Sequence, residues 1–108
     1  MPKTPFFNQY TRKMDTWDTD QGHIFVAYRD GCDDRYTRDG QEYRVDLGIG
    51  SISGPQGTLE NAQAFLRHIE EKYPEIAGRL EIVRAACAFA RRDSWIVLEG
   101  ASVTRRTA

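Results

Sequence analysis

Residues 58–74, TLENAQAFLRHIEEKYP, carry the clearest periodicity in the chain. Their apolar side chains recur at steps of three and four, which is the pattern of an amphipathic helix with one buried stripe. Thr58 suits the N-cap position, because its hydroxyl can accept a hydrogen bond from the first helical turn. Pro74 should end the helix, since the residue before a proline is pushed out of the helical region. The stripe consists of Leu59, Ala62, Leu66, Ile69 and Tyr73.

Two segments upstream of this helix have strand character. Residues 23–29, HIFVAYR, are rich in β-branched and aromatic side chains and end at the turn signal Asp30-Gly31. Residues 41–47, QEYRVDL, alternate apolar and charged side chains, as a strand with one wet face does. We expect these two strands to pair with each other in antiparallel fashion. The long connection between them should hold a short strand near Arg35–Thr37 and a tight turn at Asp39-Gly40.

Downstream of Pro74, apolar residues again recur at steps of three and four from Ile76 to Ala90. This spacing predicts a second helix from about Glu75 to Arg92. The alternative is a strand from Arg79 to Ala90. With a period of two, both faces of that stretch would mix charged and apolar side chains, which favours the helix. Residues 95–99, WIVLE, then predict a short buried strand.

These elements predict an α+β fold, in which a small antiparallel sheet of three or four short strands packs against one or two amphipathic helices. We expect one domain over residues 1–108, with an irregular segment at 1–21 and a polar tail at 100–108. The aromatic density of the first segment predicts that it packs onto the domain, or alternatively onto a partner. Short strands leave a sheet edge, which predicts homodimerisation through that edge or through the helices.

Size and composition narrow the class of protein. The chain has 108 residues, 40% of them hydrophobic and 29% charged, which are values of a folded globular domain. The net charge of −1 disfavours a general nucleic-acid binder, which needs a surplus of Lys and Arg on one face. The N-terminal residues lack the apolar run of a signal peptide or membrane span, so we expect a cytoplasmic protein with no membrane partner. Cys32 and Cys87 have no metal-ligand or redox spacing.

The net charge conceals a segregated distribution. Residues 15–46 hold nine acidic side chains and four arginines, whereas residues 79–108 hold six arginines and three acidic side chains. Segregated charge favours oriented encounter with a charged partner. We therefore predict a non-enzymatic binding protein that acts by occupying a macromolecular partner, most readily another protein. The small size adds the hypothesis of an accessory or inhibitory factor of a mobile genetic element, of the anti-defence type.

The predicted contact surface is the connection after the first strand, because its mixture of Arg, Tyr and Asp is typical of protein interfaces. Its residues are Asp30, Asp33, Asp34, Arg35, Tyr36, Arg38 and Asp39. We predict no catalytic residues, no metal and no cofactor.

Two other classes of function stay open. The Asp clusters at 15–20 and 30–39 could serve a small metal-dependent hydrolase or nuclease, although neither has calcium-loop spacing. Arg91, Arg92 and Trp95 could contact phosphate or stack a base in a nucleic-acid accessory protein. The glycine-punctuated segment 48–57 lies where a phosphate cradle would, but Ser53 stands where the dinucleotide motif needs glycine. We interpret it as a flexible linker.

Overall fold

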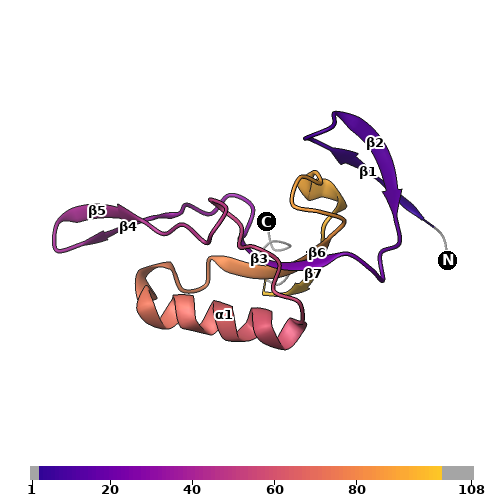
Figure 1. Cartoon of the computed structure of the whole chain (residues 1–108). Helices are drawn as coiled ribbons and strands as arrows, with labels where there is room; N and C mark the ends of the chain where they lie inside the picture. The colour runs from indigo at the N-terminus through magenta and orange to yellow at the C-terminus, as the bar shows by residue number, and fades with distance from the viewer. Residues whose placement is uncertain (1–2, 101–108) are drawn as a thin grey trace.

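The computed structural model describes residues 3–100, so the predicted tail beyond Gly100 lies outside the described residues (Figure 1). Within this range the chain forms short strands, one long helix and two 3-10 turns. In chain order these are β1 (Thr4–Asn8), β2 (Lys13–Trp17), β3 (His23–Tyr28), β4 (Arg35–Arg38), β5 (Gln41–Arg44), α1 (Leu59–Lys72), η1 (Pro74–Ile76), β6 (Leu80–Ala85), η2 (Arg92–Ser94) and β7 (Ile96–Glu99). A mixed α+β architecture is confirmed. The strands form three separate sheets, where the sequence predicted one.

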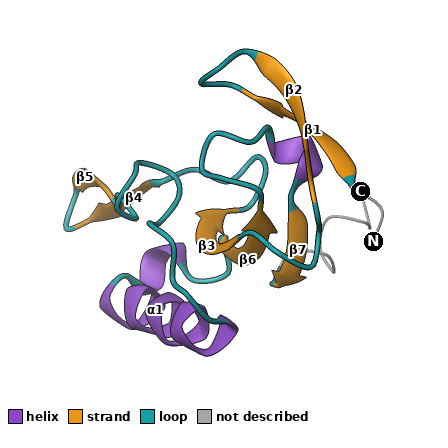
Figure 2. Cartoon of the chain, turned by 45° about the vertical axis from the view of Figure 1, so that its right-hand side comes forward, coloured by secondary structure: helices purple, strands orange, loops and turns teal. Residues whose placement is uncertain are grey.

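The central sheet is antiparallel with the strand order β3-β6-β7, and α1 covers one of its faces (Figures 1 and 2). Val26 of β3 lies opposite Ile82 of β6, and both side chains are fully buried in the main core together with Ile69 of α1. The Thr58 hydroxyl accepts a 3.0 Å hydrogen bond from the Asn61 amide. The predicted helix and its cap are therefore confirmed, and the predicted stripe is confirmed in part: Ala62 and Ile69 are buried, Leu66 and Tyr73 are half-buried, and Leu59 is exposed.

The predicted second helix at 75–92 is wrong. Only the 3-10 turn η1 follows Pro74, and the chain then enters β6, the central strand of the sheet. A strand covered on both faces does not need alternating polarity, because neither face meets water. The charged residue Glu81 made residues 80–85 look unlike a buried strand. Its side chain is nevertheless 1% exposed, and Arg92 of η2 pairs with it.

The remaining strand predictions are partly confirmed. β7 lies within the predicted segment 95–99, but it forms the edge of the sheet, and Ile96 and Val97 are 38% and 39% exposed. The expected pairing of residues 23–29 with 41–47 is wrong, because β3 pairs with β6. That long-range pairing could not be inferred while residues 80–85 were assigned to a helix.

The glycine-punctuated segment occupies the other edge of β3, which corrects its interpretation as a flexible linker. The amide of Ser53 donates to the Val26 carbonyl and that of Gln56 donates to the Ile24 carbonyl, both at 2.8 Å. The Ser53 hydroxyl is buried and accepts a hydrogen bond from the Val26 amide at 2.9 Å. These backbone groups extend the sheet, so Ser53 is engaged in the fold and is not presented to an anion.

The N-terminal segment is a β-hairpin and not irregular as predicted. β1 and β2 pair in antiparallel register, and the hairpin stands apart from α1 on the other side of the central sheet (Figure 1). Phe6 and Trp17 are each 6% exposed and pack with Ala90. Tyr10 contacts Phe89 but remains 76% exposed. The segment thus packs onto the domain in part and presents the rest of its aromatic surface.

A second hairpin, β4–β5, projects from the body of the molecule at the opposite end (Figures 1 and 2). We call residues 33–45 the arm. Its tight turn is Asp39-Gly40, as predicted, and the two residues have φ values of 52° and 79°. Consecutive positive φ values identify the type I′ turn, whose twist matches that of the two strands. The projecting arm is one reason why the molecule is elongated, with dimensions of 50 × 29 × 28 Å along its principal axes.

Candidate functional site

The arm carries most of the predicted contact residues, and a fork between two charged side chains fixes it to the body. The Arg38 guanidinium donates from Nε and Nη2 to the two carboxylate oxygens of Glu75 in η1, each at 2.7 Å. Paired hydrogen bonds of this kind fix direction as well as distance. They hold the pKa of the Glu75 carboxyl below its ordinary value. Arg38 therefore positions the arm, in addition to any contact it makes with a partner.

Arg79 makes the second connection between arm and body. Its Nη1 atom donates to the main-chain carbonyls of Asp33 at 2.9 Å and Arg35 at 2.7 Å. These carbonyls lie on the side of β4 that faces away from β5, so the guanidinium takes the place of a neighbouring strand. Neither Arg79 nor Glu75 was in the predicted site. They lie more than thirty-five residues downstream of the arm residues they bind, and no local sequence pattern links Arg79 or Glu75 to the arm.

Aromatic rings form the third connection. Tyr36 is 9% exposed, and its ring stacks on Tyr43 at a centroid distance of 5.5 Å and meets Tyr73 at 5.8 Å. A ring buried between the arm and the end of α1 cannot act as an exposed contact residue. The prediction that Tyr36 contacts a partner is therefore corrected: Tyr36 packs the arm against the body.

The outer face of the arm is polar and internally charge-balanced. Arg35 and Arg44 lie directly opposite each other across β4 and β5. Like charges in opposite positions are unfavourable, and two carboxylates offset them. Asp33 pairs with Arg35 at 3.1 Å, and Asp34 pairs with Arg44 at 2.9 Å.

These pairs correct the electrostatic part of the sequence analysis. Asp33 and Asp34 were expected to belong to a negative pole, yet each is neutralised by an arginine of the same stretch. Within the predicted basic end, Arg92 pairs with Glu81 at 2.9 Å. The arm therefore presents alternating positive and negative groups. Such a surface selects a partner by the positions of charges rather than by their sum.

Acid should loosen the arm. Hydrogen bonds from Arg35 lower the pKa of Asp33, and those from Arg38 lower the pKa of Glu75. A carboxyl whose pKa is lower in the folded state stabilises the fold above its unfolded-state pKa and loses this contribution as pH falls through the folded-state value. We expect amide hydrogen exchange in residues 35–44 to accelerate, relative to the core, as pH drops below the ordinary values of 3.8 and 4.5.

The matched control for this acid effect is Glu75→Gln. It removes the titrating group at the fork, so the arm should already exchange faster at neutral pH and should respond less to acid. Exchange with the same pH dependence in the arm and the core, after correction for the intrinsic rate, would contradict a role for these two carboxylates.

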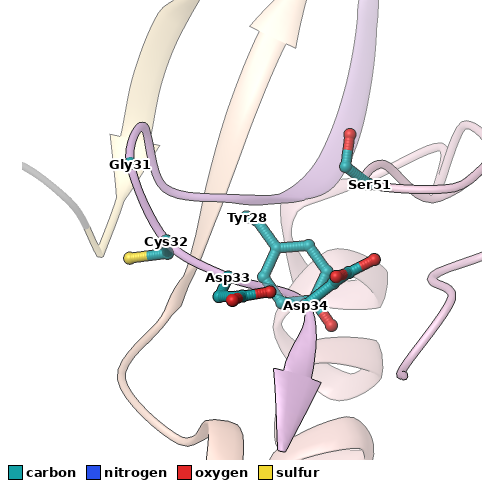
Figure 3. A pocket seen from close by; sticks show the side chains of 6 residues that line it. All are labelled: Tyr28, Gly31, Cys32, Asp33, Asp34 and Ser51. Atoms are coloured by element: carbon teal, nitrogen blue, oxygen red, sulfur yellow. The ribbon is translucent and has the colours of Figure 1, made fainter. Parts of the chain in front are cut away.

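A surface pocket of about 410 Å³ lies at the base of the arm (Figure 3). Figure 3 shows Asp33 and Asp34 beside the Tyr28 ring, whereas the sulfur of Cys32 points away from that ring. The Tyr28 hydroxyl donates to the Val45 carbonyl at 2.7 Å. Burial, reinforced by the charge of Asp34, raises the pKa of Tyr28 to about 12. The phenol is therefore protonated at neutral pH and serves to hold the base of the arm.

The remaining predicted contact residues, Asp30 and Asp39, are exposed at opposite ends of the connection. Asp30 follows β3 at the base, and Asp39 occupies the turn at the tip. The structure thus brings Asp33, Asp34 and Arg35 together on one face. It separates them from Asp30 and Asp39, and it places Tyr36 and Arg38 on the face that meets the body.

The structure also places the residues on which the two alternative functions depend, a metal-dependent hydrolase or nuclease and a nucleic-acid accessory protein. Within residues 3–100, no three His, Cys, Asp or Glu side chains lie close enough together to hold one metal ion. The Arg91 guanidinium lies 4.5 Å from the centre of the Phe7 ring, and that of Arg92 lies 4.5 Å from the centre of the Trp95 ring. Arg92 also donates to Glu81 and to the Tyr28 carbonyl. These intramolecular contacts engage the groups that the alternative of a nucleic-acid accessory protein would have used.

Comparison with protein-family models, with curated proteins and with solved structures gave no match. Among the described residues, no helix is long and apolar enough to cross a membrane.

Proposed function

We propose that this chain is a non-enzymatic binding protein that occupies a protein partner with the outer face of its arm. The observation that carries the proposal is a projecting hairpin held in one orientation by three separate connections to the body. These are the Arg38–Glu75 fork, the Arg79 hydrogen bonds and the packing of Tyr36. A hairpin fixed in this way loses little conformational entropy when it binds, which favours affinity.

The chemistry of the outer face supports a protein partner. Asp33, Arg35 and Arg44 are exposed, and each already points its charged group along the surface of the arm. An interface that combines arginine with carboxylates can accept both donors and acceptors from a partner chain. A nucleic acid is less well suited, because Arg35 and Arg44 are already paired with Asp33 and Asp34 and leave no surplus of positive charge for phosphates.

Neutralising two carboxylates of the arm tests the proposal. We expect Asp33→Asn together with Asp34→Asn to weaken capture of the partner about tenfold or more, because the substitutions remove two charges and release two arginines at the contact face. The chain is first used to isolate its partner from the source cell, and the affinity of the purified pair is then measured at two salt concentrations. The variant should show a different salt dependence from the wild type.

The matched control is Asp18→Asn together with Asp20→Asn. It makes the same change in net charge in a turn remote from the arm, where the Asp18 carboxylate accepts a hydrogen bond from the Asp20 amide. Both variants should keep the thermal midpoint within a few degrees of the wild type, because Asp20 and Asp33 are exposed and Asp18 and Asp34 are only half-buried. Equal affinities for the two variants would remove the arm from the proposed contact.

Three further parts of the proposal rest on the sequence alone. An accessory or inhibitory role, including an anti-defence role for a mobile genetic element, rests on small size, and cytoplasmic action is proposed together with it. Self-association rests on exposed sheet edges. Identification of the captured partner tests the accessory or inhibitory role. The sheet edge that would mediate self-association is specified below.

A further inference from the structure

The outer edge of β5 has main-chain groups directed away from the arm. In an antiparallel pair, alternate residues point their N–H and C=O groups at the partner strand, and the residues between them point outward. The Val45 amide donates to the Asp34 carbonyl at 2.9 Å, which places Val45 and Tyr43 on the inward side. Glu42 and Arg44 therefore point their main-chain groups outward.

The two edges of the arm differ in what meets these outward groups. On β4, the carbonyls of Asp33 and Arg35 accept hydrogen bonds from Arg79. On β5, no hydrogen bond from any residue in the range 3–100 reaches the main chain of Glu42 or Arg44. All four side chains of β5 are exposed, and the strand lies on the projecting part of the molecule (Figure 2). The β5 edge is thus available for another strand.

The side chains of β5 fit the same strand from a second copy of this chain. If two β5 strands run antiparallel with Tyr43 opposite Tyr43, Glu42 of each copy lies opposite Arg44 of the other. The outward groups of these residues would then form four main-chain hydrogen bonds around a two-fold axis. Tyr43 is 43% exposed and would meet its counterpart in the non-hydrogen-bonded position, where side chains approach most closely.

We infer that the protein self-associates through β5, which joins two arms into one four-stranded sheet with Tyr43 on the two-fold axis. Arg44 can serve both neighbours, because its side chain is 73% exposed while two of its nitrogen atoms donate to Asp34. The inference specifies the self-association proposed above. It does not depend on partner capture, so either can fail alone. The dimer would present two copies of the outer face in one sheet and bind a repeated partner bivalently.

A proline pair tests the edge. Glu42→Pro removes an outward amide and obstructs an incoming strand, but it removes no hydrogen bond within the arm. Thr37→Pro is the matched control, because Thr37 lies opposite Glu42 and carries an outward amide on β4. Sedimentation equilibrium from about 10 µM to 1 mM should show dimers for the wild type and for Thr37→Pro, and monomers for Glu42→Pro. A monomeric wild type at the highest concentration would overturn the inference, as would equal association of the two variants.

A charge exchange tests the register. Glu42→Arg alone places arginines opposite one another, and Arg44→Glu alone places glutamates opposite one another. Each variant should associate at least about tenfold more weakly than the wild type. An equimolar mixture should associate again, because both cross-strand positions then hold opposite charges. A mixture that stays monomeric, while circular dichroism shows both variants folded, would refute the Tyr43-centred register.

Discussion

Replacing Arg92 by methionine is expected to lower the free energy of unfolding by about 2 kcal/mol, the largest effect that we predict for a substitution away from the apolar core. Arg92 donates to Glu81, whose side chain is 1% exposed in the central strand, and to the Tyr28 carbonyl. The substitution removes the guanidinium that pairs with a carboxylate in a medium of low polarity, where losing part of the compensation of a charge is costly. Methionine keeps most of the apolar stem, so the effect reports the loss of the guanidinium, including its contact with the Trp95 ring.

Urea denaturation measures this effect, and two variants control it. Arg91→Met removes the neighbouring guanidinium. Arg91 is an exposed residue whose guanidinium lies over the Phe7 ring, so the substitution should change the free energy of unfolding by less than about 1 kcal/mol. Glu81→Met combined with Arg92→Met should be more stable than Arg92→Met alone, because the double variant removes the buried carboxylate together with the guanidinium that pairs with it. If Arg92→Met were as stable as Arg91→Met, Arg92 would not compensate Glu81.

Replacing Tyr36 by alanine is expected to destabilise the protein by about 3 kcal/mol and to release the arm. The substitution removes a buried ring that lies between Tyr43 of the arm and Tyr73 at the end of α1. Truncating a buried aromatic side chain to alanine loses its transfer free energy and leaves a cavity. Amide exchange in residues 35–44 should accelerate more than exchange in β3 and β6, because the other two connections of the arm do not fill that space.

Conservative variants distinguish packing by Tyr36 from a polar role. Tyr36→Phe keeps the ring and should be within about 1 kcal/mol of the wild type in thermal denaturation. Tyr43→Ala removes a ring that is 43% exposed and should cost about 1 kcal/mol. Equal losses for Tyr36→Ala and Tyr43→Ala would show that the aromatic cluster does not hold the arm.

Local signals were sufficient for the elements whose pattern is self-contained. The helix at 59–72 could be predicted because its stripe, cap and terminating proline lie within one window. The turn at Asp39-Gly40 could be predicted because positive φ angles restrict which residues occupy it. β3 has strand character on its own, since it combines β-branched and aromatic side chains.

Elements that depend on distant partners could not be predicted in the same way. β6 lacks a polar face because α1 covers one side, and the side chains of Phe25 and Trp95 lie on the other. The buried Glu81, which pairs with the distant Arg92, also placed a charged residue within this strand and so made a buried strand harder to recognise. The same holds for the candidate site: the composition of residues 30–39 indicated an exposed polar surface. Glu75 and Arg79, which orient it, are recognisable only after the chain has folded.

The pairing of β3 with β6 has a consequence for how the protein is made. His23 lies opposite Ala85, so the inner edge of β3 cannot be satisfied until most of the chain has left the ribosome. Contacts between such distant positions form slowly, and a nascent apolar strand without its neighbour attracts other chains. Synthesis at lowered temperature, or with chaperones in excess, should therefore raise the yield of native molecules.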